Sequence, residues 1–230
     1  MVAKSISELD QAIVKCNKCP RLVAWRKEVS ITKRKSYENE KYWGKPVPGF
    51  GDSNPEFLIL GLAPGAHGAN RTGRIFTGDS SGDWPYKALH KAGIAKIPTS
   101  TSMNDGQKLS KTRISCAVRC APPDNKPSTE ERNMCAHFLH QEIAILNKNL
   151  KSILALGSFA WKSAIKALEE NGFSIPKPTP NFSHGASFIS TNGKKKIKVV
   201  ASYHPSQQNT FTGKLTEKML SEAILKAKKV

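Results

Sequence analysis

The sequence predicts an α/β fold, a three-layer αβα sandwich in which helices cover both faces of a four-stranded parallel sheet. Four strand-length apolar runs lie along the chain, and helical stretches alternate with them. Each run is followed by a loop that contains Gly, Pro or His. Strands that alternate with helices are typical of parallel sheets with right-handed crossovers. Because the runs are mostly continuous apolar stretches rather than alternating ones, we expect strands that are buried on both faces.

The four apolar runs and the segments between them define the expected elements. The strands are expected over residues 57–62, 113–118, 153–156 and 197–201. Helices are expected over residues 84–92, 129–148, 158–171 and 215–228. Asp83 and Ser128 are the expected N-caps of the first two helices. Glu131 follows Ser128 at the spacing of a capping box, which strengthens the second assignment.

The N-terminal fifth of the chain has a different character. Residues 5–29 are predicted to be helical with a break at a cysteine pair, because apolar residues recur there at helical spacing. Residues 32–51 form a basic, aromatic and Gly/Pro-rich connector that we expect to lie on the surface. The length of 230 residues suits one domain, 1–230, in which residues 1–50 form an N-terminal helical arm.

The charge balance points to a polyanionic partner. The chain contains 36 Lys and Arg against 18 Asp and Glu, a formal net charge of +18. Such an excess favours nucleic acid, with a generic basic surface that aids solubility as the alternative. No apolar run reaches the ~18–20 residues that cross a bilayer. Glu8 and Asp10 interrupt the segment where a signal peptide would be apolar, so we expect a soluble, cytoplasmic protein without a membrane partner.

Four of the five cysteines have a spacing that indicates a metal centre. Cys16 and Cys19 form a C-x-x-C pair, and Cys120 and Cys135 form a second, more widely spaced pair. Four soft thiolates from two chain segments suit a tetrahedral zinc ion or an iron–sulfur cluster, and the spacing does not choose between them. Disulfides remain an alternative for a hyperthermophilic protein. Cys116 is left over and is expected to be a reduced core thiol.

The loops that follow the predicted strands carry the unusual chemistry. Ligands of such sheets bind outside the carboxyl ends of the strands. The first loop has glycines at 61, 65, 68 and 73, which allow close backbone approach to a ligand, but it lacks the Gly-Lys-Ser/Thr of a P-loop. His204 directly follows the fourth strand, where it can donate to a developing anion or move a proton near neutral pH. Phe76 is expected to be exposed in the first loop and able to stack on a planar base, with an ordinary anchor of that loop as the alternative.

The absence of paired acids at the strand ends limits the mechanism. No Ser-His-Asp order and no carboxylate pair occurs there, so an activated nucleophile or a two-carboxylate mechanism is disfavoured. Electrostatic stabilisation of a leaving group needs no such base.

Three features together resemble a known family. GLAPGAHGANRTGRIFTGDSSG, HPSQQNTFTGKLT and the four-cysteine pattern are similar to the type B (family 5) uracil-DNA glycosylases. The resemblance extends from Cys16 to about Thr216. It implies a base excision repair enzyme that flips a damaged base out of DNA, hydrolyses its N-glycosidic bond and leaves an abasic site. It also implies a four-iron, four-sulfur (4Fe-4S) cluster. The implied cluster ligands are Cys16, Cys19, Cys120 and Cys135.

The resemblance also implies a role for individual residues. His204 would stabilise negative charge on the departing base, and Phe76 would stack against that base. The backbone around Ala63, with Asn70 nearby, would position the attacking water. Phe211 would act as a wedge in the space left by the flipped nucleotide. The other residues expected to contact the base or the DNA strand are Gly65, Cys116, Asn209 and Lys214.

One departure from the family pattern predicts a broad base range. Relatives commonly carry an asparagine where this chain has Cys116, and a thiol is only a weak hydrogen-bonding group. We therefore expect relaxed discrimination that includes hypoxanthine. The expected substrate is double- or single-stranded DNA with deaminated bases, bound in the nucleoid by a monomer, with a sliding clamp as a further candidate partner. An iron–sulfur electron-transfer protein and a non-enzymatic nucleic-acid-binding protein are the alternative functions.

Overall fold

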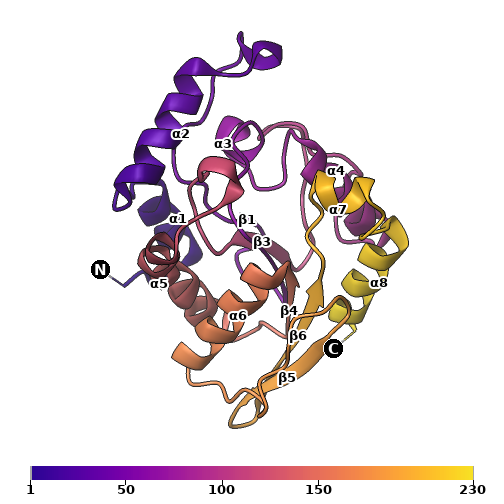
Figure 1. Cartoon of the computed structure of the whole chain (residues 1–230). Helices are drawn as coiled ribbons and strands as arrows, with labels where there is room; N and C mark the ends of the chain where they lie inside the picture. Colours follow the sequence, from indigo (N-terminus) through magenta and orange to yellow (C-terminus); the bar gives the residue numbers. More distant parts are fainter. Residues whose placement is uncertain (1, 230) are drawn as a thin grey trace.

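A six-stranded mixed sheet forms the middle layer of the fold (Figure 1). The computed structural model describes residues 2–229. Its strands are β1 (Phe50–Gly51), β2 (Phe57–Gly61), β3 (Thr112–Cys116), β4 (Ser152–Leu156), β5 (Ser187–Asn192) and β6 (Lys195–Ser202). They are ordered β1-β3-β2-β4-β6-β5, with β3, β2, β4 and β6 mutually parallel and β1 and β5 antiparallel at the edges. The expectation of a four-stranded, wholly parallel sheet is therefore wrong, because an antiparallel strand is added at each edge.

Helices cover both faces of this sheet (Figure 1). One face is covered by α1 (Ile6–Val14), α5 (Thr129–Leu146) and α6 (Ser158–Glu170), and the other by α4 (Ser80–Lys91) and α8 (Glu217–Lys228). The remaining helices are α2 (Pro20–Thr32), α3 (Ala69–Thr72), α7 (Gln207–Phe211) and two short 3-10 turns, η1 (Lys35–Tyr37) and η2 (Pro123–Asn125). Because α3 follows β2 and α7 follows β6, both lie beyond the carboxyl edge of the sheet. None of the helices in the described chain is long and apolar enough to cross a membrane.

The pleat of the strands divides the core into two apolar clusters. In β2, Leu58 and Leu60 pack toward α5 and α6, whereas Phe57 and Ile59 pack toward α4 and α8. Every residue of β2, β3 and β4 is buried. Burial on both faces is the reason that β2 and most of β4 are apolar runs in the sequence, whereas β3 contains Arg113 and Ser115, which donate to the buried Glu142 carboxylate.

Of the two helix N-caps expected from the sequence, Ser128 is confirmed and Asp83 is wrong. Ser128 caps α5 in a full capping box, since the Glu131 amide donates to Ser128 Oγ at 3.1 Å and the Ser128 amide donates to Glu131 Oε2 at 2.7 Å. Asp83 is not the N-cap of α4. The helix begins four residues earlier, and its cap is Asp79, whose Oδ1 accepts the Ser81 amide at 3.1 Å. The Ser- and Gly-rich first turn hides the helical periodicity there.

The connector over residues 32–51 is more than a surface loop. Tyr42 and Val47 are buried, so the expectation of a surface segment is wrong for this part. The amide of Trp43 donates to the carbonyl of Arg71 at 2.8 Å, and the amide of Gly44 donates to the carbonyl of Asn70 at 3.0 Å. These bonds fasten the arm to the loop that follows β2.

A buried charge network fixes β3 against α5. The Glu142 carboxylate is fully buried and accepts from Arg113 Nε at 2.7 Å, Ser115 Oγ at 2.6 Å and Arg119 Nη2 at 2.5 Å. Burial alone would raise the pKa of Glu142, but the Arg119 and Arg113 guanidinium groups and the Ser115 hydroxyl hold it at about 2. The network therefore stays charged at any physiological pH and holds the end of β3 in place.

Candidate active site

The loops after β2, β3 and β6 meet at the carboxyl edge of the sheet. Gly61 pairs with Cys116 at the ends of β2 and β3, and the amide of Ala117 continues the ladder by donating to the Gly61 carbonyl at 3.0 Å. A Cβ placed on Gly61 would lie 3.1 Å from the Phe76 ring and 3.2 Å from Cys116 Sγ. Glycine is therefore needed at this position, because it lets the ring and the thiol meet over the end of β2.

Phe76 is held in a strained and enclosed position. Its side chain is only 8% exposed, so the expectation of an exposed ring is wrong. Its backbone is left-handed, with φ of 53°, a conformation that costs energy for a residue with a Cβ. A Cβ on Gly82 would lie 2.0 Å from the Phe76 carbonyl oxygen, which shows that the first turn of α4 packs directly against the Phe76 backbone. The surroundings thus impose the orientation of the ring.

His204 faces Phe76 from the end of β6. The two ring centres are 6.2 Å apart and the ring planes meet at 43°. Desolvation lowers the pKa of His204 to about 4, so the imidazole is uncharged near neutral pH and has one N–H that can donate a hydrogen bond. Asn209 Nδ2 donates to the His204 carbonyl at 2.9 Å. Asn209, which the sequence suggests as a substrate contact, therefore also fixes the histidine loop.

Asp79 is a site residue that was not expected from the sequence. A Cβ on Gly68 would lie 1.7 Å from Asp79 Oδ2, and one on Gly65 would lie 2.8 Å from it. The carboxylate is thus enclosed by the glycine loop, and burial raises its pKa despite hydrogen bonds from Ser81. The signal in the sequence was an Asp directly before a Ser-Ser-Gly helix start, which is the pattern of an N-cap.

Asn70 and Ala63 lie in the first loop region as expected. Asn70 is fully buried on α3, where its Nδ2 donates to the Arg26 carbonyl at 3.3 Å and to the Ala66 carbonyl at 3.4 Å. Its Oδ1 is buried without a partner in the described structure. Ala63 packs at the margin of the α5–α6 core cluster. Asn70 therefore joins α2 to the loop, and a role of either residue in positioning water stays a prediction.

The segment after His204 presents exposed groups beside the site. Phe211, at the end of α7, is 81% exposed, which is unusual for an aromatic side chain. Lys214 is also exposed, with Nζ 5.1 Å from the centre of the Tyr203 ring. Both residues follow β6 and so lie at the same edge of the sheet as His204.

Comparison with known proteins identifies the family. Residues 48–228 match the family described as the Uracil DNA glycosylase superfamily. This chain belongs to that superfamily. Its relatives include the type-5 uracil-DNA glycosylase of Mycobacterium bovis, 47% identical over 99% of this chain and 82% of the relative. The type-5 uracil-DNA glycosylase of Thermus thermophilus is 44% identical over 96% of this chain and 95% of the relative. The type-4 uracil-DNA glycosylase of Thermotoga maritima is 29% identical over 79% of this chain. The resemblance to the family 5 uracil-DNA glycosylases is confirmed.

This member of the uracil-DNA glycosylase superfamily gathers its four spaced cysteines around one cavity. Cys16 and Cys19 lie between α1 and α2, Cys120 follows β3, and Cys135 lies on α5. All of them are free thiols, and burial raises the pKa of Cys120 to about 12 and that of Cys135 to about 11. Within residues 2–229, no three His, Cys, Asp or Glu side chains are placed to hold a single metal ion.

Arg119 also lines this cavity. Its backbone amide donates to Cys135 Sγ at 3.3 Å. Its side-chain Nε and Nη1 are buried and have no partner in the described structure, while Nη2 is bonded to Glu142. In this superfamily member, therefore, a residue that lines the cysteine cavity has two buried donors without acceptors.

Proposed function

We propose that this protein is a uracil-DNA glycosylase of base excision repair, which hydrolyses the bond between uracil and deoxyribose and leaves an abasic site. The observation that carries the proposal is the pairing of an uncharged His204 with the Phe76 ring over a floor of Gly61 and Cys116. Membership of the uracil-DNA glycosylase superfamily and the type-5 names of its relatives support the substrate.

The geometry supports a mechanism in which the base leaves as an anion. The target nucleotide is flipped out at a cost of roughly a few kcal/mol, and Phe76 offers its ring face to the base. As the bond between C1′ and the base nitrogen breaks, the bonding electrons remain on the base. His204 donates a hydrogen bond to that developing charge, and a donor fixed in advance is most effective in such a desolvated site. Water adds to C1′, and its proton is released to the surroundings.

Positioning of the water is assigned to the first loop. We assign it to the backbone around Ala63 and to the buried Oδ1 of Asn70, which has no protein partner. The Asp79 carboxylate, enclosed by Gly65 and Gly68, fixes the shape of the loop around that position.

DNA binding is assigned to the basic surface and to the α7 segment. The net charge of +18 supplies salt-dependent affinity for phosphates. We assign the wedge role to the exposed Phe211 and a strand contact to Lys214. Asn209 supports this segment by fixing the backbone of His204.

The base range is proposed to include hypoxanthine. Cys116 is buried next to Gly61 and Phe76, and burial raises the pKa of its thiol to about 12. A neutral thiol donates and accepts only weak hydrogen bonds, so it cannot select uracil by its polar edge as an amide would. Release rates for uracil and hypoxanthine from matched duplexes test this, and a uracil preference of several orders of magnitude would contradict it.

We propose that the four-cysteine cavity holds a 4Fe-4S cluster rather than a single zinc ion. The four cysteines from two chain segments line one cavity, and four thiolates are the ligand set of such a cluster. The unpartnered Nε and Nη1 of Arg119 are donors of the kind that bond cluster sulfurs. When bound, the cluster would supply a structural tie between the N-terminal arm and the start of α5. Equal iron and acid-labile sulfide in a brown preparation would support this, and stoichiometric zinc would contradict it.

The decisive experiment is incubation of the purified protein with a labelled uracil-containing duplex, followed by alkaline cleavage at abasic sites. We expect cleavage with the wild-type protein and its loss in His204→Ala, with DNA affinity retained. A folded wild-type protein that leaves the duplex intact would overturn the proposal. In that case, binding without cleavage would favour a non-enzymatic nucleic-acid-binding protein, and a reducible cluster without DNA binding would favour electron transfer.

A further inference from the structure

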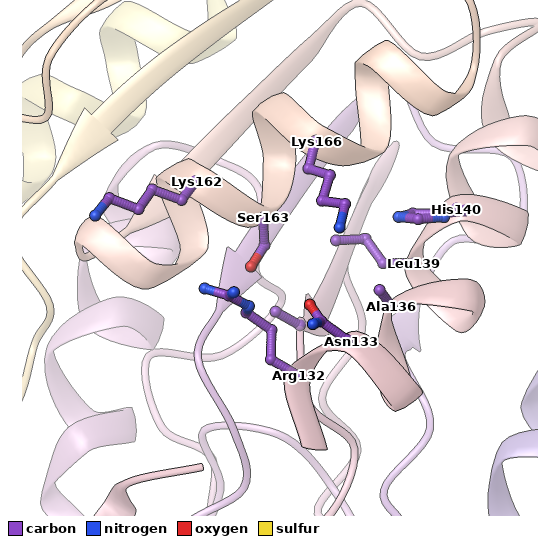
Figure 2. Close-up of a pocket in the computed structure, with 9 residues that line it drawn as sticks. Arg132, Asn133, Ala136, Leu139, His140, Lys162, Ser163 and Lys166 are labelled. Carbon is purple, nitrogen blue, oxygen red and sulfur yellow. The ribbon is translucent and has the colours of Figure 1, made fainter. Parts of the chain in front are cut away.

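A basic cavity of about 150 Å³ lies between α5 and α6, outside the proposed active site (Figure 2). The two helices pack side by side on one face of the sheet. The floor of the cavity is apolar and includes Ala117 and Leu139. Its polar lining consists of Arg132, Asn133 and His140 from α5 and Lys162, Ser163 and Lys166 from α6.

The charge of this cavity is positive and is not balanced by the protein. Arg132, Lys162 and Lys166 take part in none of the ion pairs found among the described residues. No Asp or Glu lines the cavity, although Glu170 acts electrostatically on His140 from outside it. Lys162 and Lys166 are also four residues apart on one helix, a like-charge spacing that destabilises an isolated helix. An anion in the cavity would offset this repulsion.

A buried hydroxyl supplies a second, independent indication of a ligand. Ser163 Oγ is buried and has no hydrogen-bond partner in the described structure. Figure 2 shows Ser163 and Lys166 pointing from α6 toward α5, with Arg132 and Asn133 opposite and Lys162 extending to one side. An unpartnered buried hydroxyl costs free energy unless something bonds it. A ligand with acceptor oxygens would satisfy it together with the cations.

The position of the cavity indicates which anion it binds. Both α5 and α6 begin at the carboxyl edge of the sheet, and Arg132 and Lys162 lie in their second turns. Ala117 of the floor directly follows Cys116, which contacts the proposed base site. We propose that this cavity binds a phosphate group of the DNA strand that flanks the flipped nucleotide. The proposal rests on the proposed function, and it assigns part of the strand-binding surface to α5 and α6.

The test measures binding of undamaged duplex DNA across a range of salt concentrations. The variant Lys162→Gln/Lys166→Gln is compared with Lys194→Gln/Lys196→Gln, which removes two exposed lysines at the opposite edge of the sheet. Loss of one phosphate contact makes the negative slope of log K against log salt less steep by about 0.9, which is about eightfold weaker binding at 0.1 M salt if binding is equal at 1 M. We expect this change in the first variant and no change in the control. Equal slopes in the two variants would overturn the proposal.

Two further measurements separate a ligand site from a structural feature. Ser163→Ala removes a hydroxyl that has no protein partner, so we expect an undiminished Tm but weaker DNA binding. Inorganic phosphate is titrated against the protein, with the Ser163 amide signal as the probe, and duplex DNA should compete with it. If phosphate binds and duplex DNA does not compete with it, the cavity is a site for free phosphate, and the assignment to a DNA phosphate is overturned.

These measurements remain informative if the proposed function fails. The duplex contains no uracil, so the binding slopes do not depend on excision. Failure of the wild-type protein to excise uracil would overturn the proposed function alone, whereas equal slopes with normal excision would overturn only the phosphate site.

Discussion

Protonation of His204 offers a direct test of the proposed leaving-group mechanism. An ordinary histidine has a pKa of 6.5, but desolvation lowers that of His204 to about 4. The difference corresponds to about 3 kcal/mol against the charged ring. At pH 7 only about one molecule in 1,000 carries an imidazolium. The proposed donor to the departing base is therefore the neutral ring.

The assay is single-turnover excision of uracil from pH 5 to pH 8 with saturating enzyme. A neutral donor predicts a rate that does not follow the titration of a histidine anywhere in this range. His204→Ala should lose about 100- to 1,000-fold in rate, the usual cost of removing a preorganised donor. His90→Ala, on the exposed end of α4, is a histidine control that should retain the wild-type rate.

A different pH profile would refute the reasoning. If the reaction required the imidazolium, the rate would rise about tenfold for each unit of falling pH until the pKa is reached.

The titration of His204 also affects the stability of the fold. The unfolded chain protonates His204 near pH 6.5, whereas the folded chain protonates it only near pH 4. The free energy of unfolding is therefore highest above pH 6.5 and decreases as the pH falls from 6.5 toward 4. An NMR midpoint near 6.5 for this ring would also contradict the assignment.

Three further substitutions test the site and the fold. Gly68→Ala places a Cβ where Asp79 Oδ2 lies. We therefore expect the free energy of unfolding, measured in urea, to fall by about 1–3 kcal/mol and excision to slow. Wild-type values for both would contradict the conclusion that the glycine loop encloses the Asp79 carboxylate. Phe211→Ala should leave the Tm unchanged, because the ring is 81% exposed, but should slow excision from duplex more than from single-stranded DNA; equal effects on the two substrates would exclude a wedge. Ser128→Ala breaks the capping box of α5 and should cost about 1 kcal/mol of unfolding free energy; no change would show that the cap contributes nothing.

The central strands could be predicted from the sequence because burial leaves a strong signal. The runs that became β2, β3, β4 and β6 are mostly apolar, and each lies within two residues of its expected bounds. The edge strands left no comparable signal. In β5 buried and exposed residues alternate, with Ile189 half exposed, and β1 has only two residues. Both depend on pairing with a neighbour rather than on their own composition.

Parts of the site required the structure because they depend on long-range contacts. The glycine loop and His204 could be located at the strand ends from the sequence. The burial of Phe76 could not be predicted from the sequence, because most of its sequence neighbours are polar. The residues that enclose the ring, Gly61 and His204, are distant in the sequence. The basic cavity between α5 and α6 was also hidden, since Arg132 and Lys166 look like ordinary surface residues until the two helices are placed together.

The left-handed backbone at Phe76 has a consequence for engineering. Glycine adopts this conformation freely, so Phe76→Gly would relieve a local strain that the native residue must carry. The same change would remove the aromatic face on which the base is proposed to stack. Because the ring is buried in the apolar core, its loss would also leave a cavity that costs about 3–5 kcal/mol, more than the strain relieved, so selection for heat resistance alone should retain Phe76.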